Sequence, residues 1–119
     1  MMSTELDALL GRFAPHVGDL ARSLVATVEE LRPDFAGKVQ RGWGSVNFRH
    51  PKAGFVCAVF PSDAGHVDLV FEHGRLLSSP LLTDNGKARQ VRWIRLVPGD
   101  EIPTDEIGIL LAEAVALKA

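Results

Sequence analysis

The sequence predicts a single α+β domain, with helices at both ends of the chain and an antiparallel sheet between them. Apolar residues recur every three to four positions near each terminus, and they alternate with polar residues after Gly37. These are the periods of amphipathic helices and of strands. A chain of 119 residues, of which 46% are hydrophobic, is long enough for one core and too short for two. Residues 1–119 are therefore expected to form one domain.

The N-terminal part of the chain predicts two helices. Thr4 is expected to cap a short helix whose apolar residues have helical spacing and which ends by Pro15. Pro15 suits the first turn of a second helix, because its missing N–H group would have no partner there. Apolar residues with helical spacing continue through residues 17–31, and Pro33 then stops the helix. This pattern predicts a helix over residues 16–32.

Glycine and proline divide the middle of the chain into strand-length segments, which is typical of a meander. Strands are expected at residues 38–41, 45–49, 54–60, 66–71 and 89–97. The short connections between the first four segments favour antiparallel pairing. Residues 55–60 are apolar at every position, so this strand is expected to be central, the most buried, and covered on both faces.

A longer connection, residues 76–87, leads to the fifth strand. Within it, Asn85 and Gly86 predict a turn that needs a positive φ angle. Connections of this length frequently carry function. Beyond the last strand, Thr104 is expected to cap a C-terminal helix that has Asp105 in its first turn.

Charge and cysteine content limit the classes of partner. The formal net charge is −2, from 13 basic and 15 acidic residues, which disfavours binding to nucleic acid or to an anionic membrane surface. No apolar stretch approaches the roughly 18 residues of a spanning helix. The single cysteine, Cys57, cannot form an intramolecular disulfide, and the first residues lack the apolar segment of a secretion signal. A cytoplasmic location is therefore expected.

The sequence lacks residues that known catalytic motifs require. Residues 81–87 end in Gly-Lys, as in a phosphate-binding loop, but Leu81 replaces the first glycine and Ala88 replaces the magnesium-binding Ser or Thr. Ser45 lacks the flanking glycines of a nucleophile elbow. Cys57 lies among hydrophobic residues and is expected to be a buried, unreactive thiol. No catalytic residue is therefore predicted.

The histidines do not form a recognisable metal motif. None of the four is spaced for a helical pair of ligands, and the chain has no Cys-x-x-Cys motif. The weak candidates are His66, Asp68 and Glu72, which should share one face of a strand and whose nitrogen and oxygen atoms suit iron or manganese. An exposed polar strand face has the same pattern and is commoner. The sequence therefore predicts neither a metal site nor a cofactor.

Positive charge is concentrated around the last expected strand, at Lys87, Arg89, Arg92 and Arg95. Arg92 should share a face with apolar residues, so it is expected to reach inward and to need a carboxylate or a ligand as its partner. Surface ion pairing by all four residues is the favoured interpretation.

Trp43 is the second candidate for a binding site. It lies between Gly42 and Gly44, where small neighbours let a ligand approach closely. Packing in the core is nevertheless favoured, because one tryptophan is large enough to anchor a contact between a sheet and a helix.

Several pieces of the sequence together resemble the YdhG-like domain family of unknown function. They are Trp43-Gly44, the run from His66 to Phe71 with Gly74 and Leu76, and Gly86-Lys87 followed by Arg92. The resemblance covers about residues 17–115. It implies a two-layer sandwich, with an antiparallel sheet of about five strands and the N-terminal and C-terminal helices packed on one face. One relative is described as a frataxin-like iron chaperone, so iron binding is an alternative that the resemblance implies.

The function predicted from these residues is that of a cytoplasmic, non-enzymatic binding module. Its groove is expected at Trp43, Lys87 and Arg92, and its ligand is expected to be a small anion or a segment of a partner protein. An iron chaperone and an enzyme without a recognisable motif are the alternatives. Clustered carboxylates would favour the chaperone, and a deep pocket with a perturbed acid or base would favour the enzyme.

Overall fold

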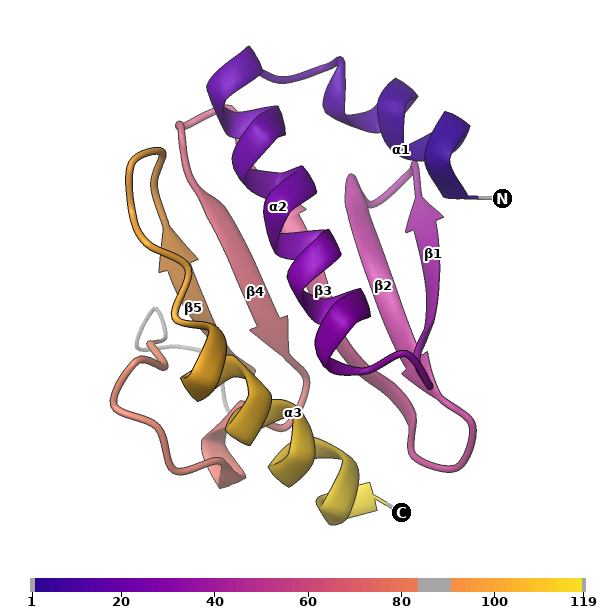
Figure 1. Cartoon of the computed structure of the whole chain (residues 1–119), viewed down its shortest axis with the longest axis vertical. Helices are drawn as coiled ribbons and strands as arrows, with labels where there is room; N and C mark the ends of the chain where they lie inside the picture. The colour runs from indigo at the N-terminus through magenta and orange to yellow at the C-terminus, as the bar shows by residue number, and fades with distance from the viewer. Residues whose placement is uncertain (1, 84–90, 119) are drawn as a thin grey trace.

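A computed structural model of the chain describes residues 2–83 and 91–118, which form an α+β sandwich (Figure 1). The helices in the described residues are α1 (Met2–Leu10), α2 (Pro15–Leu31) and α3 (Thr104–Lys118), together with a short 3₁₀ helix, η1 (Gly74–Leu76). The strands are β1 (Ala36–Gln40), β2 (Ser45–His50), β3 (Gly54–Pro61), β4 (Val67–Phe71) and β5 (Arg92–Leu96).

The sheet is an antiparallel meander in the order β1-β2-β3-β4-β5, as the sequence predicts. Strand β3 is central, and its residues 56–59 are all buried. Strand β5 begins at Arg92, and the earlier part of the expected fifth strand and the expected turn at Asn85 and Gly86 lie outside the described residues. Thr83 extends the sheet beyond β5 by pairing with Trp93.

Helices α2 and α3 lie side by side on one face of the sheet, as the family resemblance implies (Figure 1). A row of buried aliphatic side chains crosses this face from β2 to β5 and consists of Val46, Val59, Leu69 and Ile94. Leu24 of α2 and Leu110 of α3 are completely buried in the same cluster. Each such side chain contributes about 1.5–3 kcal/mol, so this shared apolar layer holds the fold together.

The helix ends agree only partly with the sequence. Pro15 begins α2, as expected. Thr4 does not cap α1, because that helix begins two residues earlier, at Met2. Thr104 does not cap α3 either. It already belongs to the first helical turn, and its hydroxyl donates to the carbonyl oxygen of Ile102 (3.3 Å) and does not accept a helical N–H.

The second face of the sheet is not covered by any of the described helices (Figure 1). Because side chains alternate along a strand, this outer face carries the residues between the buried ones. One row across it consists of Asn47, Ala58, Val70 and Trp93. The next row includes Phe60, Asp68 and Arg95. Ala58 of β3 is nevertheless buried on this face, although the described helices cover only the other face.

Among the described residues, no helix has the length and apolar character that crossing a membrane requires.

Candidate ligand-binding site

A hollow of about 680 Å³ lies on the outer face, where the β1–β2 turn, the β3–β4 turn and the α1–α2 connection meet. We call it the outer basin. Its aromatic and aliphatic lining includes Phe13, Trp43, Phe60, Val70 and Trp93. Its charged or titratable lining consists of Arg12, Asp63, His66, Asp68 and Arg95. The volume and the mixed lining fall within the range of small-molecule sites.

Trp43 stands out from the protein at the rim of the outer basin, with 78% of the residue exposed. Its backbone N–H and that of Gly44 both donate to the carbonyl oxygen of Gln40, which closes a tight turn between β1 and β2. Gly44 adopts a φ of 70° there, a conformation that favours glycine. The favoured interpretation of Trp43 as a core residue is wrong, because the turn projects it beyond the end of the sheet.

Arg12 belongs to the connection between α1 and α2 and lies beside the same turn. Its Nη1 atom donates to the carbonyl oxygen of Arg41 at 3.2 Å, which ties the connection to the turn that carries Trp43. Within residues 2–83 and 91–118, no carboxylate pairs with Arg12. Its charge is therefore not neutralised by an ion pair in the described part of the chain. The sequence gives no signal for this residue, since 29 positions separate it from its acceptor.

Asp68 and Arg95 form an ion pair on the floor of the outer basin. They lie opposite each other in the register of β4 and β5. Arg95 Nε is 2.9 Å from Asp68 Oδ1, and Arg95 Nη2 is 3.0 Å from Asp68 Oδ2. The hydrogen bond to Asp68 raises the pKa of Arg95, so Arg95 stays charged and paired. His66 Nε2 is 3.7 Å from the same carboxylate.

Trp93 forms part of the wall, and its indole N–H is buried. No acceptor for this group occurs among the residues that the structure describes. A buried donor without an acceptor costs about 1–3 kcal/mol. Trp93 therefore lines the outer basin without a hydrogen bond from its Nε1 to any described residue.

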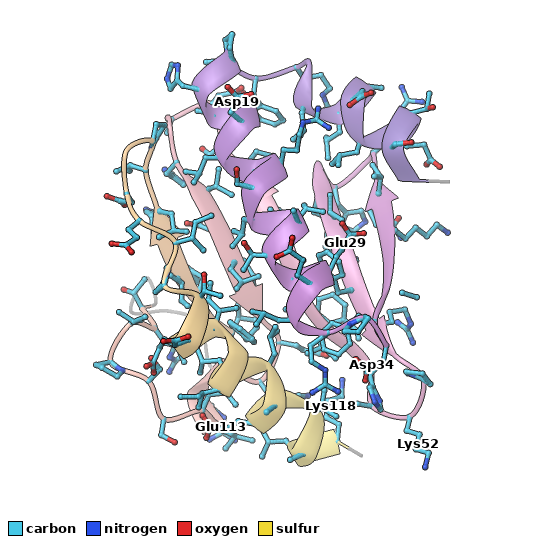
Figure 2. All side chains as sticks on the ribbon, in the orientation of Figure 1. Asp19, Glu29, Asp34, Lys52, Glu113 and Lys118 are labelled. Carbon is cyan, nitrogen blue, oxygen red and sulfur yellow. The ribbon has the colours of Figure 1, made fainter. Side chains whose placement is uncertain are left out.

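The weak metal candidates do not converge. His66 and Asp68 lie together, but the chain leaves the sheet after Phe71. Glu72 Oε2 is 3.2 Å from Lys118 Nζ at the end of α3, where Figure 2 shows Lys118. The expectation that Glu72 shares a strand face with His66 and Asp68 is wrong, because β4 ends at Phe71. The described residues contain no group of three His, Cys, Asp or Glu side chains that could hold a metal ion.

Arg92 lies on the face that the helices cover, as the alternation predicts. It pairs with Phe71 in the sheet register, and its Nη1 donates to the carbonyl oxygen of Val91 at 2.8 Å. Arg92 does not line the outer basin. The structure therefore does not bring Trp43 and Arg92 into one groove. Lys87 lies outside the described residues.

A second hollow, of about 460 Å³, lies at the β2–β3 turn, near the labels of Asp34 and Lys52 in Figure 2. Arg32 donates to both carboxylate oxygens of Asp34 (2.9 and 2.6 Å), which lowers the pKa of Asp34. His50 Nε2 is 3.3 Å from the same carboxylate, and His50 Nδ1 accepts the backbone N–H groups of Lys52 and Ala53. These polar groups satisfy one another and hold the turn, so the outer basin is the stronger candidate.

Comparison of the chain with family models, with curated proteins and with solved structures finds no match. The resemblance to the YdhG-like family stays a prediction.

Proposed function

We propose that this protein is a non-enzymatic binding module, and that the outer basin holds a small organic molecule with an acidic group and a planar apolar body. The observation that carries the proposal is the position of Arg12. This arginine has no ion-pair partner in the described part of the chain and lies at the rim of a hollow with aromatic walls.

The acidic group would bind at Arg12. Its guanidinium has five N–H donors, and the only hydrogen bond that it makes within the described residues goes to a backbone carbonyl. A carboxylate, sulfonate or phosphate can accept the remaining donors in charge-assisted hydrogen bonds. Arg95 is less suited to this role, because Asp68 already takes two of its donors.

The apolar body would lie against the aromatic lining. Trp43 offers a largely exposed indole, and Phe60 and Trp93 are partly exposed on the outer face. Aromatic contacts of this kind contribute about 0.5–1.5 kcal/mol each beyond the area that they bury. Trp and Arg are also the residue types on which binding energy is most often concentrated.

The enzymatic alternative has less support. Ser62 lines the outer basin, but its hydroxyl accepts the backbone N–H of Ala64 at 3.0 Å within its own turn. The His66–Asp68 pair is tied to Arg95, and none of the described hydrogen bonds joins His66 to a nucleophile. The absence of a three-ligand cluster from the described residues leaves the iron-chaperone alternative without a specific observation in its favour.

We place the module in the cytoplasm, because its single cysteine is a buried free thiol.

The intrinsic fluorescence of the protein is sensitive to ligands in the outer basin. Its two tryptophans, Trp43 and Trp93, both line the hollow, and the chain has no tyrosine. We therefore propose a fluorescence titration with anilinonaphthalene sulfonate, and with N-phenylnaphthylamine as the same ring system without the acid. The sulfonate should quench the tryptophans saturably and bind more tightly than the neutral analogue. Arg12→Gln should weaken sulfonate binding about 10-fold to 100-fold, because about one charge-assisted hydrogen bond is lost. The affinity for the neutral analogue should change less than about twofold.

Arg75→Gln is the matched control, because Arg75 is an exposed arginine of η1 that does not line the outer basin. This variant should bind both probes as the natural chain does. Equal affinity for the acid and the neutral analogue, or an Arg12→Gln variant that still binds the sulfonate normally, would contradict the proposal. So would binding that appears only in mild denaturant, since partly unfolded proteins bind this dye without a formed site.

A further inference from the structure

Asp63 is a second charged residue at the rim of the outer basin that has no ionic partner in the described part of the chain. It lies in the turn between β3 and β4 and is exposed. The turn is closed by other groups: Ser62 N–H donates to His66 O (2.9 Å), and Gly65 N–H donates to Ser62 O (3.1 Å). The carboxylate of Asp63 takes part in none of these bonds. It is therefore not needed to form the turn.

The charged lining of the outer basin is balanced. Arg12 and Arg95 carry positive charge, and Asp63 and Asp68 carry negative charge. Because Asp68 and Arg95 pair with each other, Arg12 of the α1–α2 connection and Asp63 of the β3–β4 turn are the charges left for a ligand. A purely anionic ligand would be attracted by Arg12 and repelled by Asp63. A ligand that carries both charges would complement both rims.

We infer that the ligand of the outer basin is a small zwitterion with an aromatic body, and an aromatic amino acid is the simplest compound of this class. This inference rests on the proposed function and adds the amino group to it. The carboxylate would accept from Arg12, the ammonium group would donate to Asp63, and the ring would lie against Trp43 and Phe60. Each of these four side chains lines the same hollow.

Three compounds with the same phenyl ring test the inference: phenylalanine, phenylpropionate without the amine, and phenethylamine without the acid. Binding is measured by calorimetry and by quenching of the two tryptophans, which both line the outer basin. Phenylalanine should bind most tightly. Each compound that lacks one charged group should bind about 10-fold more weakly or worse, because one charge-assisted hydrogen bond is lost.

Two substitutions assign the two charges. Asp63→Asn should weaken the binding of phenylalanine about 10-fold, because the ammonium group loses its partner. The affinity for phenylpropionate should stay unchanged or rise slightly, because the substitution removes a carboxylate that repels the anion. Arg12→Gln should weaken the binding of phenylalanine and phenylpropionate but not the binding of phenethylamine. The matched control is Glu30→Gln, which removes an exposed carboxylate on α2, away from the outer basin. The side chain of Asp63 makes no hydrogen bond within the described residues, so its substitution should leave the melting temperature unchanged.

The outcomes separate this inference from the proposed function. If phenylpropionate binds as tightly as phenylalanine, or if Asp63→Asn alters the affinity for neither compound, the zwitterion inference is wrong while the proposed function stands. The same holds if anilinonaphthalene sulfonate binds through Arg12 but none of the three phenyl compounds does. If neither the sulfonate nor phenylalanine binds, both are wrong.

Discussion

Cys57 lies on the helix-facing side of β3, with Phe48 of β2 and Phe71 of β4 as its neighbours in the sheet register. The residue is completely buried, and burial raises the pKa of its thiol. A thiol in such surroundings stays protonated and is a poor nucleophile. Its place in the protein is therefore that of a small apolar side chain in the core, which is the role that its hydrophobic neighbours in the sequence predict.

We expect Cys57→Ser to lower the free energy of unfolding by about 1–3 kcal/mol, because a hydroxyl would be buried without an arranged partner. Cys57→Ala is the control, since it removes the sulfur without adding a polar group and should be the more stable of the two variants. Urea unfolding of both variants measures the difference. A serine variant as stable as the alanine variant, or a native thiol that reacts rapidly with a labelling reagent, would contradict this account.

At the scale of elements, the contact between η1 and β5 depends on one glycine. Gly74 is buried against Arg92, and a Cβ atom at Gly74 would lie 2.8 Å from the backbone nitrogen of Arg92 and 2.9 Å from its Cα. Backbone atoms cannot move aside as a flexible side chain can. A larger residue at this position would therefore push η1 away from β5.

Gly74→Ala should destabilise the protein by about 1–3 kcal/mol, the usual cost of overpacking. Gly42→Ala is the matched control, because no atom lies within 4 Å of a Cβ placed there. That variant should change the free energy of unfolding by less than about 0.5 kcal/mol. Denaturation curves of the two variants give the comparison. Equal stability of the two would show that η1 does not pack on β5 as described.

At the scale of the whole molecule, one apolar cluster joins all the layers. It contains residues of α1, α2, α3 and of every strand. The radius of gyration is 13.3 Å, close to the roughly 13.5 Å expected of a compact chain of this length. No element in the described residues has a separate core, so no part of the fold is expected to unfold alone.

Unfolding should therefore be a single cooperative transition. Tryptophan fluorescence reports on the outer basin, where both tryptophans lie, and far-UV circular dichroism reports on helices that cover the opposite face. The two urea curves should coincide, with one midpoint. A fluorescence transition that precedes the loss of helix would show that the outer face opens independently, and would contradict the prediction.

The sequence by itself determined the order, type and approximate limits of the elements, and the central place of β3. These properties follow from local patterns: the period of apolar residues, proline at the start of α2, and an unbroken apolar run in residues 55–60. The inward face of Arg92 was also predictable, since alternation along a strand is local geometry. The caps at Thr4 and Thr104 were not, because several nearby residues can begin a helix at similar cost.

The tertiary structure alone decided the candidate site. Trp43 lies outside the core. Arg12 bonds to Arg41, which is 29 positions away in the sequence, and Glu72 bonds to Lys118, which is 46 positions away. The tertiary structure also brought Asp63 to the same hollow as Arg12. Such contacts depend on how whole elements pack, and the residues concerned carry no periodic signal. Packing between distant segments fixes which side chains meet, whereas local backbone geometry fixes which residues form a helix or a strand.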